Sequence, residues 1–151
     1  MELIDELAGK DAKRGYQLML ELEAQSFQSD ALYRLFDEFV GLTGYSSSLV
    51  RTRGFRLAVA QAQWDEQGKI ASRFSGLAAM LHDDKPTAVR QCLSALHRAV
   101  ELRPQLAPLV TAELDRVDVS KYAPSMAPLV AQDVAALRER IRECATPSRT
   151  R

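Results

Sequence analysis

Apolar side chains recur at steps of three and four residues along almost the whole chain, the spacing that places them on one face of an α-helix. The strict apolar–polar alternation of a half-buried strand is absent, and glycine is scarce, with 7 residues in 151. The pattern therefore predicts an all-α protein. The expected helices cover residues 2–8, 11–25, 30–43, 47–64, 69–81, 85–103, 105–117 and 126–142.

Capping and turn residues lie where these helices meet. Serine and aspartate accept hydrogen bonds from the first backbone N–H groups of a helix, and proline is tolerated in a first helical turn. Residues of these kinds, and glycines suited to turns, occur at Ser29, Asp30, Gly44, Ser46, Ser47, Ser48, Gly68, Asp83, Asp84, Pro86, Pro104 and Ser125.

A repeat becomes visible when Arg14, Arg51 and Arg90 are aligned, since they are 37 and 39 residues apart. A leucine follows each arginine six residues later, and the second helix of each unit begins with an apolar residue. Two-helix units of about 40 residues are typical of HEAT and armadillo arrays. We therefore expect about three helical hairpins and a C-terminal helix, stacked so that each unit covers the apolar face of its neighbour.

Arg51 falls inside the apolar arc of its helix when positions are set roughly 100° apart. A charge within a packed face needs a partner, because an unpaired buried charge is costly, and a guanidinium suits a carboxylate. Asp83 or Asp84, just before the next hairpin, can supply it. We expect Arg51 and Arg90 to be structural, as parts of a ladder of ion pairs between repeats.

A second group of basic residues is expected to be exposed. Arg53 and Arg56 lie outside the apolar arc, three residues apart. Lys69 and Arg73 lie one turn apart at the edge of a predicted buried stripe made by Ile70, Phe74, Leu77, Ala78 and Leu81. Arginine is enriched at the centres of protein interfaces, so Arg53, Arg56, Lys69 and Arg73 form the candidate binding surface.

The segment "DDKPTAVRQCLSALHRAVELRPQLAPLVTAELDRVD" resembles a HEAT repeat, with a proline early in the first helix, then Val–Arg, then leucines at helical steps. The strings "SSSLVRTRGFRLAVAQAQWDEQGK", "DDKPTAVRQC" and "SKYAPSMAPL" are similar to those of a family of small bacterial HEAT-like proteins of undetermined function. Some members are labelled SufBD-related, after an iron–sulfur assembly scaffold. The resemblance implies an α-α superhelix, and it implies no reaction and no catalytic residue.

Trp64 and Asp65 invite comparison with DNA glycosylases of the HEAT-like superfamily, which use aromatic residues and an aspartate around a damaged base. Here the two residues are adjacent at the end of one helix rather than one turn apart. We expect Trp64 to be structural and to close its hairpin by packing on the helix that follows.

The sequence shows no set of residues with the spacing of a metal or catalytic site. Cys92 and His97 lie about 140° apart on one helix, and His82 is fifteen residues from His97. An iron–sulfur cluster needs several thiolates, whereas the chain has only Cys92 and Cys144. We expect no enzyme activity, metal or cofactor.

Charge and targeting signals narrow the function further. Lys and Arg together number 20, as do Asp and Glu, so no overall field attracts nucleic acid or an anionic membrane. The acidic start is unlike a signal peptide, no segment has the length of a membrane span, and two unclustered cysteines suit the cytoplasm. We expect one domain at residues 1–144, a disordered tail at 145–151, and a cytoplasmic scaffold that binds a protein or peptide. The alternative is a nucleic-acid-binding or DNA-repair protein, which requires the basic residues to converge.

Overall fold

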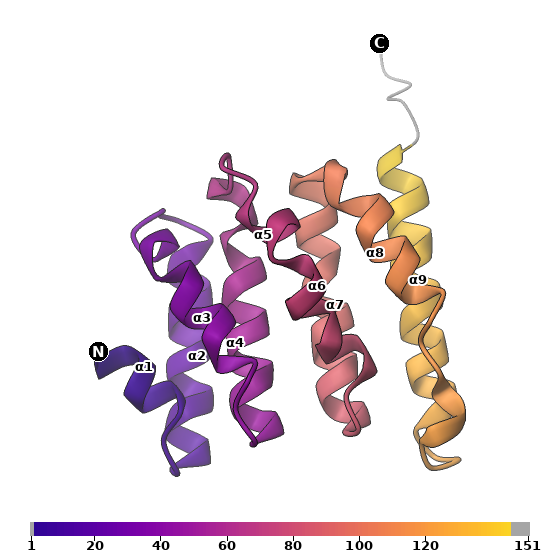
Figure 1. Ribbon diagram of the computed structural model, residues 1–151, viewed down its shortest axis with the longest axis horizontal. Coiled ribbons are helices and arrows are strands. Elements are labelled where there is room, and N and C mark those ends of the chain that lie inside the picture. The colour runs from indigo at the N-terminus through magenta and orange to yellow at the C-terminus, as the bar shows by residue number, and fades with distance from the viewer. Residues whose placement is uncertain (1, 146–151) are drawn as a thin grey trace.

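The computed structural model describes residues 2–145, which are helical apart from short connections and contain no β-strand (Figure 1). The α-helices are α1 (Glu2–Leu7), α2 (Ala12–Ser26), α3 (Phe36–Leu42), α4 (Ser48–Val59), α5 (Lys69–Ser72), α6 (Phe74–Leu77), α7 (Pro86–Leu102), α8 (Ala107–Leu114) and α9 (Ala127–Ala145). Short 3-10 helices cover Tyr33–Leu35, Ala60–Trp64, Ala78–His82, Pro104–Leu106 and Val119–Lys121. The predicted all-α class is confirmed.

Ala145 ends α9 rather than starting the expected tail, and residues 146–151 lie outside the described part of the chain.

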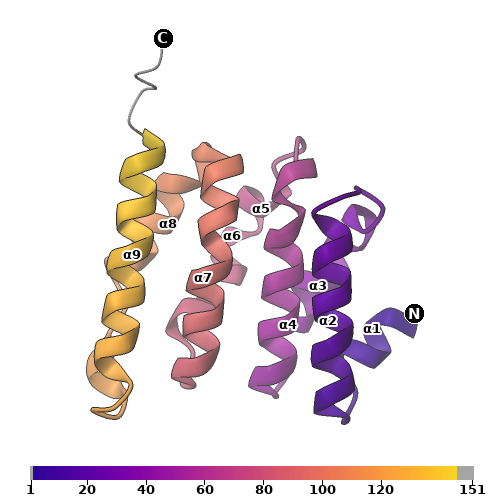
Figure 2. The ribbon, with the colours of Figure 1, turned by 180° about the vertical axis from the view of Figure 1, so that it is seen from behind.

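The helices form two layers. The longer helices α2, α4, α7 and α9 stand side by side and run in the same direction, as both views show (Figures 1 and 2). Each contacts the next, α2 with α4, α4 with α7, and α7 with α9. The shorter helices α3, α5, α6 and α8 form the second layer, which lies in front of the first in Figure 1 and behind it in Figure 2, and they lead the chain back to the level at which the next long helix begins. None of the helices between residues 2 and 145 has the length and apolarity needed to cross a bilayer.

The second layer is less regular than the sequence predicts. The expected helix at residues 69–81 divides at Arg73 into α5 and α6 and ends as a 3-10 helix. The serines and glycine of this stretch favour a helix weakly, and Ser72 Oγ donates to the Lys69 carbonyl 3.1 Å away. The predicted stripe is nevertheless buried at every position. Tertiary burial therefore sets which residues face the core even where local propensity breaks the helix.

The two layers meet in one continuous apolar core. Its largest fully buried side chains come from both layers and are Leu7, Met19, Leu35, Phe36, Phe39, Leu42, Phe55, Leu57, Ile70, Leu77, Met80 and Leu81. The layers approach most tightly where α4 crosses α3. A Cβ atom at Gly54 would lie 2.5 Å from the Phe39 carbonyl oxygen and 2.6 Å from Leu42 Cβ. Only a glycine permits this crossing.

The aligned arginines do not make one uniform ladder. Arg14 pairs with Glu6, Arg51 with Asp83, and Arg90 with Asp133 of α9. Arg51 and Arg90 each pair with a carboxylate at or just before the next long helix, as the expected ladder requires, whereas Arg14 pairs back to α1.

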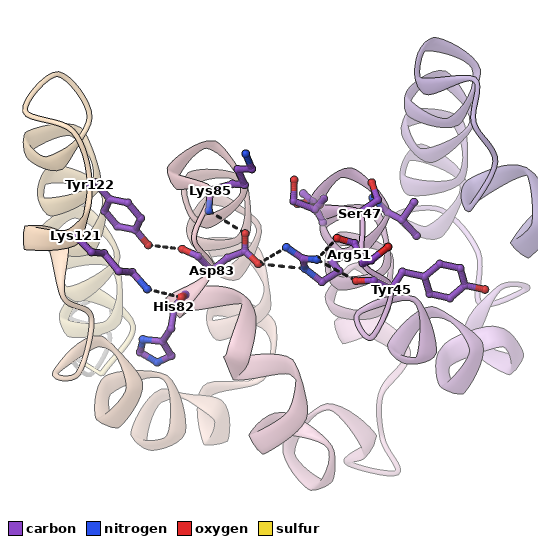
Figure 3. Close-up of polar contacts among 12 residues, drawn as sticks. Tyr45, Ser47, Arg51, His82, Asp83, Lys85, Lys121 and Tyr122 are labelled. Atoms are coloured by element: carbon purple, nitrogen blue, oxygen red, sulfur yellow. Dashed lines mark hydrogen bonds and ion pairs between the residues drawn. The ribbon is translucent and has the colours of Figure 1, made fainter.

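Arg51 joins the loops at the starts of the first-layer helices (Figure 3). Its Nε and Nη2 donate to Asp83 Oδ1 over 3.1 and 2.7 Å, and its Nη1 donates to the carbonyls of Tyr45 and Ser46. The Asp83 carbonyl in turn accepts from Tyr122 Oη at 2.6 Å. Asp84 is exposed, so its expected structural role as the partner of Arg51 is wrong. Asp83 takes that role because it lies nearer the end of the preceding 3-10 helix.

Arg53 is buried, contrary to the prediction that it is exposed. Only 3% of its surface is accessible, and its Nη1 and Nη2 donate to the carbonyls of Leu7 and Ala12 over 2.7 and 3.2 Å. Burial lowers the pKa of its guanidinium. A Cβ at Gly15 would lie 2.5 Å from Arg53 Nη1, so this glycine makes room for the charge. Arg53 therefore holds α1 and the start of α2 against α4.

Gly54→Ala is expected to lower the free energy of unfolding by about 1–3 kcal/mol, because the added methyl group forces α3 and α4 apart. Gly41 is the matched control: it lies in α3, and a Cβ there meets nothing within 4 Å. Gly41→Ala is expected to raise stability by about 0.5–1 kcal/mol through helix propensity. Urea unfolding of both variants measures the difference, and equal effects would refute the close crossing.

Arg53→Ala is expected to lower the free energy of unfolding by about 2–4 kcal/mol, since it opens a cavity and removes the side-chain hydrogen bonds to the Leu7 and Ala12 carbonyls. Gly15→Ala alone also destabilises the fold by displacing the guanidinium. In the Arg53→Ala background the same change is expected to stabilise α2, by up to about 1 kcal/mol. A double-mutant cycle measures this reversal of sign, and additive effects would contradict the contact.

Candidate binding groove

The four basic residues predicted to form a binding surface are not brought together. Arg53 is buried under α1, and Arg56 lies on the first layer. Lys69 and Arg73 lie at α5 in the second layer, where both pair with Asp37, at 3.9 and 3.0 Å. The prediction that these four residues share one surface is wrong, because a helical wheel does not show which face of a helix packs against a neighbouring helix.

A groove instead runs along α4 between α2 and α7, on the side of the first layer away from the second. One hollow of about 270 Å³ is lined by all three helices, with Phe27 from the end of α2, Val59 from α4 and Arg98 from α7. A second, of about 170 Å³, continues toward the start of α4 beside Tyr16. Gln91 of α7 lines both. Because residues of α2 and α7 border the same hollows, α4 forms the floor of what we name the α4 groove.

Arg56 crosses the middle of the α4 groove as a fixed bridge. Its Nε and Nη2 donate to Glu23 over 2.9 and 2.8 Å, and its Nη1 donates to Gln91 Oε1 over 2.8 Å. Burial lowers the pKa of Arg56, but the hydrogen bonds and charge of Glu23 outweigh it and leave the pKa raised. The prediction that Arg56 is freely exposed is therefore wrong, and its charge is already matched within the protein.

Large apolar side chains are exposed along the α2 edge of the groove. Phe27 lines the larger hollow and Tyr16 the smaller one, whereas Leu20 lines neither. Tyr16, Leu20 and Phe27 are exposed although large, and their spacing places them on one face of α2 with Glu23. In the aligned repeat Leu20 corresponds to Leu57 and Leu96, which are both fully buried. The sequence could have indicated that Leu20 is exposed, because α2 has apolar residues on two faces. The repeat alignment instead predicts that all three aligned leucines are buried.

Arg98 is the second arginine of the larger hollow and was not singled out from the sequence; Arg53 lines the smaller hollow. Its guanidinium carbon lies 4.2 Å from the centre of the Phe27 ring, and its Nη2 donates to Gln63 Oε1 over 3.0 Å. Its Nε is buried without a hydrogen-bond partner. The backbone of Gln63 is itself held, since its carbonyl accepts from Arg103. Arg98 is thus positioned by neighbours that do not neutralise its charge.

Trp64 and Asp65 serve the fold rather than the groove. Trp64 Nε1 donates to the Ser26 carbonyl over 2.7 Å and so ties the end of its 3-10 helix to α2. The expected packing of Trp64 on the helix that follows stays a prediction. Asp65 is buried and accepts from the backbone N–H groups of Lys69 and Ile70. It also accepts from Tyr33 Oη at 2.5 Å, and burial together with this carboxylate raises the pKa of Tyr33. Both oxygens of Asp65 are used in starting α5.

The histidines lie apart from each other. His82 Nε2 is 2.7 Å from Glu113 Oε1, while His97 borders a separate hollow between α7 and α9. Burial and the nearby Arg140 lower the pKa of His97. Across residues 2–145, no three His, Cys, Asp or Glu side chains gather in a way that could hold a metal ion.

Comparison of the chain with models of known protein families, with curated proteins and with solved structures gave no significant match.

Proposed function

We propose that this protein is a non-catalytic scaffold, a HEAT- or armadillo-like right-handed superhelix that binds a segment of a partner protein in the α4 groove. The observation that carries the proposal is the exposed stripe of Tyr16, Leu20 and Phe27 on one face of α2, of which Phe27 lines the larger hollow and Tyr16 the smaller one. Exposed apolar patches with polar surroundings mark interaction sites. Aromatic residues and arginine are the types that most often anchor protein interfaces.

The chemistry of the groove supports binding rather than catalysis. In the described chain, the ionisable side chains that line the larger hollow are Glu23, Arg56 and Arg98. Glu23 is held by Arg56, and an arginine stays protonated in proteins. A protonated arginine cannot accept a proton as a general base does, and both oxygens of Glu23 accept hydrogen bonds from Arg56.

The distribution of charge favours a protein partner over nucleic acid. Binding to a phosphate backbone needs several cations along one surface. The four basic residues considered for that role are separated, and Arg56, Lys69 and Arg73 each pair with a carboxylate. We also propose a cytoplasmic location, which agrees with the free thiols of Cys92 and Cys144.

Leu20→Glu is expected to abolish partner binding without unfolding the protein, because it places a carboxylate on the exposed stripe. Leu109→Glu of α8 is a matched control on the second layer, since Leu109 is 38% exposed and Leu20 is 37% exposed. The measurement is quantitative affinity capture from cell extract, with melting temperatures showing that both variants fold.

The expected result is a partner that wild type and Leu109→Glu retain and Leu20→Glu loses. If every captured protein is retained by Leu20→Glu, the α4 groove is not the binding surface and the proposal is wrong.

A further inference from the structure

We infer that the α4 groove recognises an acidic segment of the partner, with one carboxylate bound by Arg98 and an adjacent apolar side chain on the stripe of Tyr16, Leu20 and Phe27. The inference rests on the proposed function and adds the chemistry of the bound segment. It is based on a difference between two arginines that line one hollow, of which only one has a carboxylate partner.

Arg56 and Arg98 line the same hollow, yet only Arg56 has an acidic partner. The Glu23 carboxylate contacts Arg56 at 2.8 Å, whereas no described carboxylate forms an ion pair with Arg98. The hollow therefore has two positive charges and one negative charge on its lining. A bound carboxylate would balance this charge.

The guanidinium of Arg98 is positioned before any ligand arrives. The Phe27 ring covers it, and Gln63 Oε1 accepts from its Nη2. Gln63 is neutral, so the hydrogen bond orients the group and leaves its charge available. Its Nε has no acceptor although it is buried, and an unmet buried donor is unfavourable. A guanidinium held in one orientation loses less entropy when it binds a carboxylate.

The apolar stripe on α2 indicates which side chains lie next to the carboxylate in the bound partner segment. Phe27 touches Arg98 and belongs to the same face of α2 as Leu20 and Tyr16. A carboxylate on Arg98 therefore brings the adjoining residues of the segment onto this face. The floor from Leu49 to Ala60 is about 16 Å long at 1.5 Å per helical residue, and about five extended residues cover it.

Peptide display tests the inference without knowledge of the natural partner. A library of random heptapeptides is selected on the intact protein, and bound sequences are compared with those selected on Leu20→Glu. The expected result is that peptides dependent on Leu20 are enriched in Asp or Glu next to Leu, Phe or Tyr. Enrichment of apolar residues without acids would overturn the inference and leave the proposed function standing. Failure to obtain any peptide dependent on Leu20 would count against both.

Charge exchange then identifies Arg98 as the contact. Arg98→Gln is expected to weaken the selected acidic peptide about tenfold or more, as for loss of a charge-assisted hydrogen bond. Arg116→Gln is the control, because Arg116 is a highly exposed arginine beside Glu113, outside the groove. Arg98→Glu is expected to regain affinity for a peptide in which the acid is replaced by lysine. Fluorescence anisotropy measures all pairs, with circular dichroism as the check on folding.

The nucleic-acid alternative is an outcome of the same assay. A single-stranded 20-nucleotide DNA is added as competitor at 0.15 M salt (about the physiological value). The expected result is that the peptide stays bound. Displacement by this DNA, lost in Arg98→Gln, would show that the groove prefers phosphate and would overturn the inference. Equal peptide affinity in wild type and Arg98→Gln, with no rescue by charge exchange, would also overturn it.

Discussion

The close crossing of α3 and α4 at Gly54 is the constraint on which the rest of the structure depends. Because the Phe39 carbonyl and Leu42 lie against the glycine, α4 packs closely on the second layer, and most of its residues are buried. Its neighbours α2 and α7 then border it on both sides. The depth of α4 is what turns the free side of the first layer into a groove rather than a flat surface.

The arginines around α4 have different roles that follow from where each guanidinium can reach. Arg51 joins loops through Asp83 and two carbonyls, and Arg53 satisfies the carbonyls of Leu7 and Ala12 in the interior. Arg56 ties α2 to α7 across the groove. Of the two arginines that line the larger hollow, only Arg98 has no carboxylate partner, since its described neighbours are an aromatic ring and an amide. The contacts of each arginine therefore depend on the partners available to it and not on residue type.

For the proposed scaffold role, contacts at one end of the α4 groove hold its walls in place. The groove wall on α2 ends in the Ser26 carbonyl, which Trp64 holds from the 3-10 helix that follows α4. Arg103, just after α7, holds the same 3-10 helix by donating to the Ala62 and Gln63 carbonyls. These contacts fix the end of the groove that contains Arg98. Preorganisation of this kind reduces the entropy lost on binding.

The sequence by itself determined the all-α class, the positions of nearly all the helices and the buried stripe of the second layer. Apolar spacing and capping residues are local properties, so one chain segment contains the information. Tertiary structure alone decided that Arg53 is interior, that Asp83 rather than Asp84 meets Arg51, and that Leu20 is exposed where Leu57 is buried. It also decided that Phe27, Gln91 and Arg98 share one hollow. A helical wheel gives the direction of each side chain, but the neighbour that meets it depends on how helices distant in sequence pack.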